Sequence, residues 1–156
     1  MKILFAAVGS PRAPWAKEAL EHYQRFLAKY ATCEWRWVRA APASVSNVVE
    51  IRRIEAERVL ETVAHADGFK VACDSSGEAF DTLAFARRWQ KATDTRGGRA
   101  IVVVGGAWGL DAKVRKWADL VWSFGPLTLP HELALVTAAE QIARALSILR
   151  GDSYHK

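Results

Sequence analysis

The chain has 156 residues, 51% apolar and 25% charged, which fits one globular domain over residues 1–156 and excludes a disordered or fibrous protein. Its apolar runs are too short for a membrane span. Cys33 and Cys73 form no CxxC pair, so we expect neither a metal site nor a disulfide framework. Residues 1–9 lack the pattern of a signal peptide, so we expect a cytoplasmic protein. The net charge of +5 favours nucleic acid or another acidic partner.

The first segments predict strand, helix and strand. Residues 2–8 are an apolar run ended by Gly9-Ser10-Pro11, which is typical of a buried strand. Pro14 suits the start of a helix, and apolar residues recur at helical spacing from there to Tyr30. Residues 33–38 predict a second strand, and a loop follows it.

The middle of the chain continues the alternation. Asn47 is a suitable N-cap for a helix that runs to Val63, with charges of opposite sign spaced along its polar face. Residues 69–73 predict a third strand, closed by a turn at Asp74-Ser75-Ser76-Gly77. A helix over residues 82–93 comes next.

The last third predicts two short strands, over residues 99–104 and 120–123, with a helix beginning at Asp111 between them. A long helix over residues 132–149 is stopped by Gly151. Apolar strands that alternate with helices predict an α/β fold, with a mostly parallel open sheet and helices on both faces. In such sheets the ligand lies beyond the carboxyl ends of the strands.

A glycine cluster, Gly105-Gly106-Ala107-Trp108-Gly109, follows the fourth strand. Glycines let the backbone approach a ligand closely, so this segment either binds a ligand or makes a tight turn. Its Gly-Gly-x-x-Gly spacing differs from the dinucleotide fingerprint, and no acidic residue follows about 20 positions later. A Walker A loop is excluded because no Gly-Lys-Ser/Thr follows.

Residues 124–130 join the fifth strand to the last helix and contain Gly125, Pro126 and Pro130. The segment is too rigid and apolar for an ordinary solvent loop. It either lines a pocket, where its backbone groups and apolar walls suit an adenine, or serves as a packed connector. His131 begins the last helix, where a histidine commonly caps or packs.

The chain ends in Tyr154-His155-Lys156, which supplies a hydrogen-bond donor, a group that titrates near neutrality and a cation. That set suits proton removal and phosphate contact, whereas chain ends more often fray and carry no function. Glu140 and Arg144 are four positions apart on the last helix and are expected to pair.

These segments, in this order, resemble the bacterial large-subunit ribosomal RNA pseudouridine N3-methyltransferases of the SPOUT class. The resemblance covers nearly the whole chain. The motifs that carry it are Val8-Gly9, Gly105-Gly106-x-x-Gly109, Leu127-Thr128-Leu129-Pro130-His131, Glu140-Gln141 and Tyr154-His155-Lys156.

The resemblance implies a SPOUT fold whose C-terminal part threads a trefoil knot, a feature that is rare among proteins. It implies a homodimer with the cofactor pocket near the subunit interface. The cofactor would be S-adenosylmethionine, and the substrate a pseudouridine of 23S ribosomal RNA in the assembled ribosome.

The resemblance also implies roles for individual residues. The cofactor-binding residues would be Cys73, Gly105, Phe124, Gly125, Pro126, Leu127, Thr128 and Leu129. His155 is our choice for the base that takes the N3 proton, Tyr154 would orient the nucleobase, and Glu140 would order the tail. The RNA contacts would come from Arg144, Lys156 and His131.

The chain departs from the family pattern at Leu135, where many members have Arg, at Ala143, where many have Tyr, and at Ser153, where some have Pro. The first two departures put dimer or RNA contacts of the last helix in doubt. One alternative function is a non-catalytic ribosome- or RNA-binding protein of the same fold, which would bind RNA but no cofactor. Another is a nucleotide-dependent oxidoreductase, which would bind a dinucleotide and would not need the last three residues.

Overall fold

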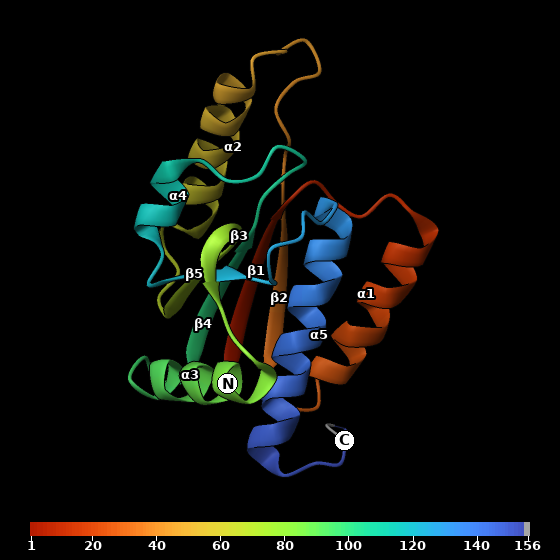
Figure 1. The fold of residues 1–156 in the computed structure, drawn as a ribbon, viewed down its shortest axis with the longest axis vertical. Helices are drawn as coiled ribbons and strands as arrows, with labels where there is room; N and C mark the ends of the chain where they lie inside the picture. The colour runs from red at the N-terminus through yellow and green to blue at the C-terminus, as the bar shows by residue number, and fades with distance from the viewer. Residues whose placement is uncertain (155–156) are drawn as a thin grey trace.

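The computed structural model describes residues 1–154, which form a five-stranded sheet with helices on both faces (Figure 1). The strands are β1 (Lys2–Val8), β2 (Thr32–Val38), β3 (Phe69–Ala79), β4 (Arg99–Val104) and β5 (Leu120–Ser123). The helices are α1 (Pro14–Leu27), α2 (Val48–Val63), α3 (Thr82–Asp94), α4 (Ala112–Trp117) and α5 (His131–Arg150). The strand order is β2-β1-β4-β3-β5, and all neighbouring strands are parallel, which confirms the predicted α/β class.

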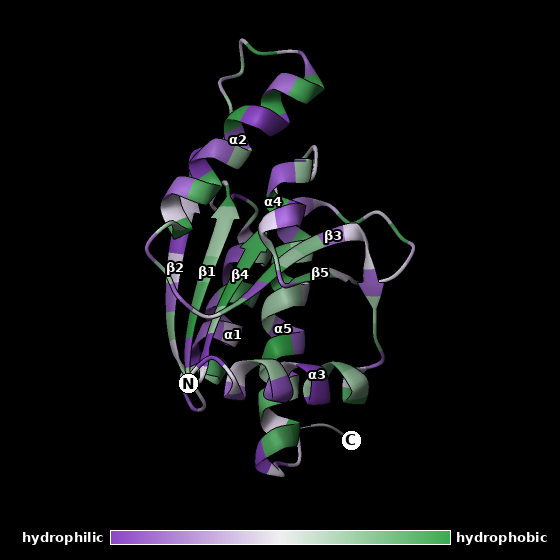
Figure 2. Cartoon of the chain, turned by 90° about the vertical axis from the view of Figure 1, so that its left-hand side faces the viewer, coloured by the Kyte–Doolittle hydropathy of each residue, from purple (hydrophilic) through white to green (hydrophobic). Residues whose placement is uncertain are grey.

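The two faces of the sheet bury alternate residues of the same strands. In β1, Ile3, Phe5 and Ala7 belong to a core shared with α1, α3 and α5. The residues between them face the opposite way, into a second core shared with α2 and α4. Burial on both sides explains why the central strands β1 and β4 are apolar after their first residues, Lys2 and Arg99, as their green colour in Figure 2 shows.

The ends of the helices follow local signals in the sequence. Pro14 is the first residue of α1, and the Asn47 side chain caps α2 by accepting the backbone N–H groups of Val49 and Glu50 at 2.9 and 3.1 Å. Gly151 ends α5 with a φ of 73°, a conformation that glycine adopts without strain. These predicted boundaries are confirmed.

The predicted end of the third strand is wrong. Cys73 and Glu78 both pair with Trp122 of β5, so residues 74–77 bulge out of the ladder and the strand then resumes. Gly77 lies so close to the backbone of Val121 that a β-carbon would not fit there. The segment has the composition of a turn, but pairing with β5 pulls the chain back into the sheet.

Helix α5 packs against both α1 and α3 and runs along one face of the sheet (Figure 1). Its first residue lies at the carboxyl ends of the strands, and its 20 residues carry the chain about 30 Å towards the opposite edge. None of the helices within residues 1–154 combines the length and the hydropathy needed to cross a membrane. The trefoil knot stays a prediction, since strand order does not test threading.

Candidate active site

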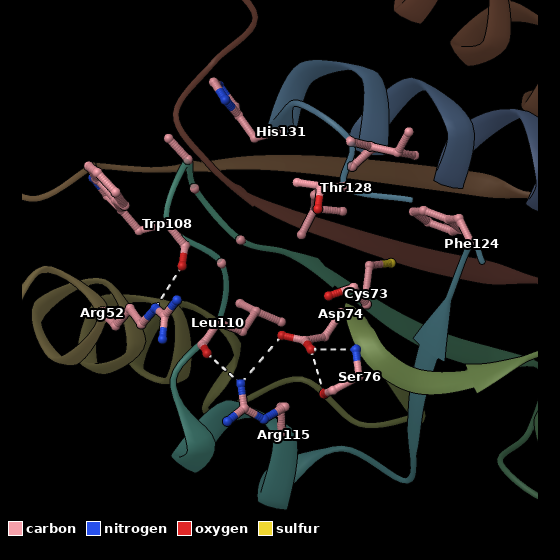
Figure 3. Close-up of a pocket in the computed structure, with 18 of the residues that line it drawn as sticks. Arg52, Cys73, Asp74, Ser76, Trp108, Leu110, Arg115, Phe124, Thr128 and His131 are labelled. Carbon is pink, nitrogen blue, oxygen red and sulfur yellow. Dashed lines mark hydrogen bonds and ion pairs between the residues drawn. The ribbon is translucent and has the colours of Figure 1, made fainter. Parts of the chain in front are cut away.

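A pocket of about 460 Å³ opens at the carboxyl ends of β3, β4 and β5 (Figure 3). Residues 73–76, residues 104–110 and residues between 124 and 131 form its walls, and Arg52 of α2 reaches its rim. Its volume lies within the usual range for small-molecule sites. The pocket also lies at the edge of the sheet where open parallel sheets bind their ligands.

The glycine loop, residues 105–109, forms one wall and is held in a closed turn. The N–H of Gly109 donates to the carbonyl of Gly106 at 3.1 Å, and Gly109 has a φ of 79°. A β-carbon on Gly105 would lie 2.9 Å from Cδ2 of Leu110 and 3.1 Å from the carbonyl carbon of Gly109. Both glycines are therefore required by the turn, which leaves backbone free to face the pocket.

The bulge of β3 forms the floor through Asp74. Its carboxylate accepts the backbone N–H and the hydroxyl of Ser76 at 3.0 and 2.6 Å, and Nη1 of Arg115 lies 3.4 Å away. Arg115 also donates to the carbonyl of Leu110 at 2.6 Å. Burial raises the pKa of Asp74, but the hydrogen bonds from Ser76 and the charge of Arg115 outweigh it and hold the pKa below its usual value. Asp74 thus joins the bulge to the end of the glycine loop.

The segment from Phe124 to Leu129 forms the facing wall. The hydroxyl of Ser123 accepts the N–H of Gly125 at 3.1 Å and donates to its carbonyl at 3.0 Å, which fixes the turn out of β5. Gly125 has a φ of 114°, so glycine is needed there. Phe124, Leu127, Thr128 and Leu129 line the pocket, and Leu127 is 75% exposed.

Cys73 contributes the only thiol among the lining residues of this pocket. Burial raises the pKa of this thiol, and the neighbouring Asp74 raises it further. The sulfur therefore keeps its proton at neutral pH and serves as part of the wall rather than as a nucleophile.

The rim of the pocket carries charged and aromatic side chains, and the sequence analysis gave no role in the site to Arg52 among them. Nε of Arg52 donates to the carbonyl of Trp108 at 2.6 Å, and the Trp108 ring is 52% exposed (Figure 3). His131, at the first turn of α5, also lines the pocket. Arg115 was missed as well, whereas the position of Asp74 at a strand end indicates a place in the site. No local sequence signal pointed to Arg52, because it reaches the pocket only through the packing of α2 against the sheet.

A second cluster joins the middle of α5 to the chain that follows this helix. Arg144 donates from Nε to Glu140 at 2.8 Å, and its guanidinium stacks over the ring of Tyr154 at 4.6 Å. The hydroxyl of Tyr154 donates to Oε1 of Glu140 at 3.2 Å. Burial, followed by the contacts with Tyr23 and Glu140, raises the pKa of Tyr154 well above its ordinary value, so its phenol stays protonated. The predicted pairing of Glu140 with Arg144 is confirmed.

The chain after α5 is held against α1. The hydroxyl of Tyr30 donates to Asp152 at 2.7 Å, and the rings of Phe26 and Tyr154 lie 4.5 Å apart. The tail is thus ordered as far as Tyr154. His155 and Lys156, the predicted base and phosphate contact, lie outside the described residues.

The predicted site residues therefore fall into two groups. Seven of the eight predicted cofactor residues line the pocket, together with His131, and Pro126 is the exception. Glu140, Arg144 and Tyr154 gather instead beside the middle and second half of α5, away from the pocket. Within residues 1–154, no group of three or more His, Cys, Asp or Glu side chains is placed to hold a metal ion.

Comparison with known proteins gives this arrangement a family. A family model described as "Predicted SPOUT methyltransferase" matches residues 1–155. The chain belongs to the SPOUT methyltransferase family. A relative from Gemmatimonas aurantiaca, named "Ribosomal RNA large subunit methyltransferase H", is 36% identical over 156 residues, which is 100% of each chain. The resemblance to this family in the sequence analysis is confirmed.

Solved structures support the SPOUT fold. A protein from Haemophilus influenzae described as a "probable methylase family protein" has a TM-score of 0.57 and 13% identity, and the match covers 99% of this chain and 70% of that one. A protein from Legionella pneumophila described as a "putative methyltransferase", solved with bound SAM, has a TM-score of 0.51 and 12% identity over 96% of this chain and 66% of that one. At such identities the likeness establishes the fold alone.

Two departures named in the sequence analysis, Leu135 and Ala143, lie on the inner face of α5. Leu135 and Ala143 are 3% and 0% exposed and lie in the core between α5 and the sheet. Neither side chain reaches the surface, so in this chain these positions serve packing rather than contacts with RNA or a second subunit.

Proposed function

We propose that this protein transfers a methyl group from S-adenosylmethionine to large-subunit ribosomal RNA, at N3 of a pseudouridine in the assembled ribosome. The observation that carries the proposal is the pocket, in which the glycine loop and the rigid segment 124–129 face each other across the carboxyl ends of the strands. Membership of the SPOUT family and the name of its relative support the reaction and the class of RNA.

The residues present fit the cofactor. Phe124, Leu127 and Leu129 offer apolar walls for an adenine, and backbone groups of the same stretch suit its polar edge. A β-carbon at Gly105 would crowd Leu110, so the glycine loop has the shape of a cradle that only a bare backbone provides. The charged rim, with Arg52 and Arg115, suits the amino-acid end. When bound, the cofactor supplies a methyl group already activated by its sulfonium.

The protein must then hold N3 in line with that methyl group and remove its proton, and most of the rate gain would come from positioning. His155 is the proposed base. Tyr154, which keeps its own proton, would donate a hydrogen bond to a nucleobase carbonyl and so orient the ring. Glu140 orders the tail by accepting from Tyr154. Arg144, Lys156 and His131 are the proposed RNA contacts.

The separation of the tail from the pocket along α5 supports a homodimer. The hydroxyl of Tyr154 contacts Glu140, which is nine residues and about 14 Å along the helix from His131 at the pocket, so the described part of the tail does not reach the pocket of its own chain. A second copy that presents its tail to the first pocket would complete the site. Two chains would also double the net charge of +5 to about +10, which favours RNA and makes binding salt-dependent. Acting on ribosomes, the protein would work in the cytoplasm.

The test is transfer of tritium from methyl-labelled S-adenosylmethionine to ribosomes that lack this modification, compared with free large subunits. We expect label in 23S RNA from assembled ribosomes and little in free subunits. Label on free subunits alone would contradict the assembled ribosome as substrate. Cofactor binding without label would point to another RNA, and absence of both would favour the non-catalytic RNA binder.

A further inference from the structure

Glu55 is a buried carboxylate that the proposed reaction does not use. It lies on the inner face of α2 and is 6% exposed. Its Oε1 accepts the backbone N–H of Ala41 at 3.1 Å. Its Oε2 has no hydrogen-bond partner in the part of the chain that the structure describes. Buried carboxylate oxygens are rarely left unpaired, because the loss of hydration is costly.

The unpaired oxygen faces the glycine loop. A β-carbon built on Gly106 would lie 2.8 Å from Oε2 of Glu55, and Gly106 itself lines the pocket. The absence of a side chain at this position therefore lets the carboxylate approach the loop from behind. Only the backbone of the loop separates the charge of Glu55 from the pocket.

The charged side chains near Glu55 interact with other partners. Asp74, the other carboxylate at the pocket, is paired with Arg115. Arg53, beside Glu55 on α2, pairs with Glu50 and Glu57 on the outer face. Arg52 directs its Nε to the carbonyl of Trp108. Within residues 1–154, Glu55 forms no ion pair, so its charge is most strongly felt on the side of the pocket.

We propose that Glu55 is a specificity-determining residue, which acts through the glycine loop to favour S-adenosylmethionine over the product S-adenosylhomocysteine. This inference rests on the proposed function. The two ligands share every polar group and differ in a methyl group and in the positive charge on sulfur. A carboxylate behind a thin wall, where water screens little, stabilises the charged ligand selectively. Once the methyl group has left, the sulfur is neutral and the attraction is lost, which favours exchange of product for fresh cofactor.

The experiment measures the dissociation constants of both ligands by calorimetry for the full chain and two variants. Glu55→Gln keeps the shape of the side chain and an oxygen for the N–H of Ala41, but removes the charge. Glu57→Gln removes a charge from the same helix on its exposed side and is the matched control. We expect Glu55→Gln to weaken S-adenosylmethionine about tenfold and S-adenosylhomocysteine less than about twofold. Glu57→Gln should change neither.

The ratio of the dissociation constants of the two ligands distinguishes the possible results. Equal weakening of both ligands would show that Glu55 only supports the loop, and an unchanged ratio with unchanged affinities would show that its charge is irrelevant; either result overturns the inference. Wild-type protein that binds neither ligand would instead refute the proposed function. If Glu55→Gln does not fold, Glu55→Asp provides the test, because it keeps the charge. The ratio of the two dissociation constants should then stay within about twofold of the wild-type ratio. A larger change in that ratio would count against the inference.

Discussion

Asp74 shows at the scale of one residue how the pocket is shaped. Its carboxylate joins the bulge of β3, through Ser76, to α4, through Arg115. The side chain of Asp74 is only 12% exposed, so these hydrogen bonds are poorly replaced by water. Asp74 thus fixes the floor of the pocket relative to the glycine loop.

We expect Asp74→Asn to destabilise the protein by about 2 kcal/mol at pH 7, the usual loss for hydrogen bonds to a charged group. Because folding lowers the pKa of Asp74, its stabilising contribution is present above the ordinary unfolded value, about 3.9, and is lost as pH falls through the lower folded value. The difference between wild type and variant should therefore shrink below about pH 4. Urea unfolding at several pH values measures it.

Asp67→Asn is the control for this prediction. Asp67 is paired with Arg99 at 3.4 Å, but its side chain is 72% exposed, and exposed pairs contribute little. This variant should leave stability almost unchanged at every pH. If Asp74→Asn loses the same free energy of unfolding at pH 3 as at pH 7, the charge of Asp74 does not stabilise the fold.

At the scale of the elements, the end of α5 decides where the tail lies. Gly151 has a φ of 73°, its N–H donates to the carbonyl of Ile148, and the next N–H, of Asp152, donates to Ser147. This left-handed turn sends the chain back towards α1, where Asp152 meets Tyr30. The turn therefore places Tyr154 beside Glu140.

We expect Gly151→Ala to cost about 1 kcal/mol, because alanine is strained at positive φ, and to lower methyl transfer several-fold by displacing the tail. Gly97→Ala is the matched control: Gly97 also has a positive φ, 62°, in open space, but lies between α3 and β4. Both variants should lose similar stability in thermal unfolding, and only Gly151→Ala should lose activity. Equal activity of the two variants would show that the position of the tail does not affect methyl transfer.

How far the elements could be predicted depended on whether their signals are local. Asn47 caps α2 with its own side chain, and Gly151 ends α5 through its own backbone conformation. These ends were therefore predicted correctly. The glycine loop and segment 124–130 could also be recognised from their composition. The extension of β3 depends on its pairing with Trp122, almost fifty residues further along the chain. Glu55 shares the helical spacing of the apolar residues of α2, but its contacts with Ala41 and Gly106 depend on how α2 docks on the sheet.

At the scale of the whole molecule, the two groups of predicted site residues are separated along α5: the pocket lies at its first turn and the second group begins at Glu140, in its middle. The sequence indicated both groups but not their separation, since strand order and helix direction arise from packing between distant segments. That separation supports the proposal of a site shared between two copies, and the proposal can be tested without a structure of the dimer.

Two inactive variants should restore activity to each other in mixed dimers. His155→Ala removes the proposed base, and Gly105→Val fills the cradle, where even a β-carbon would lie 2.9 Å from Leu110. Co-expressed in equal amounts, they should recover up to about a quarter of the wild-type rate, since half of the dimers are mixed and each has one intact site. Tritium transfer measures the recovery, and each variant alone is the control. Two variants that stay inactive together would place tail and pocket in the same chain.

The position of β1 inside the sheet also governs how the chain can fold as it is made. Lys2 pairs with Thr32 on one side and with Arg99 on the other, so one edge of this strand has no neighbour until β4 has been synthesised. Until then the nascent chain presents an apolar strand with unpaired backbone groups, a surface prone to aggregation. The centre of the sheet therefore assembles late and through contacts distant in sequence, which favours slow folding. Translation must run nearly two thirds of its course before the first strand is complete on both sides.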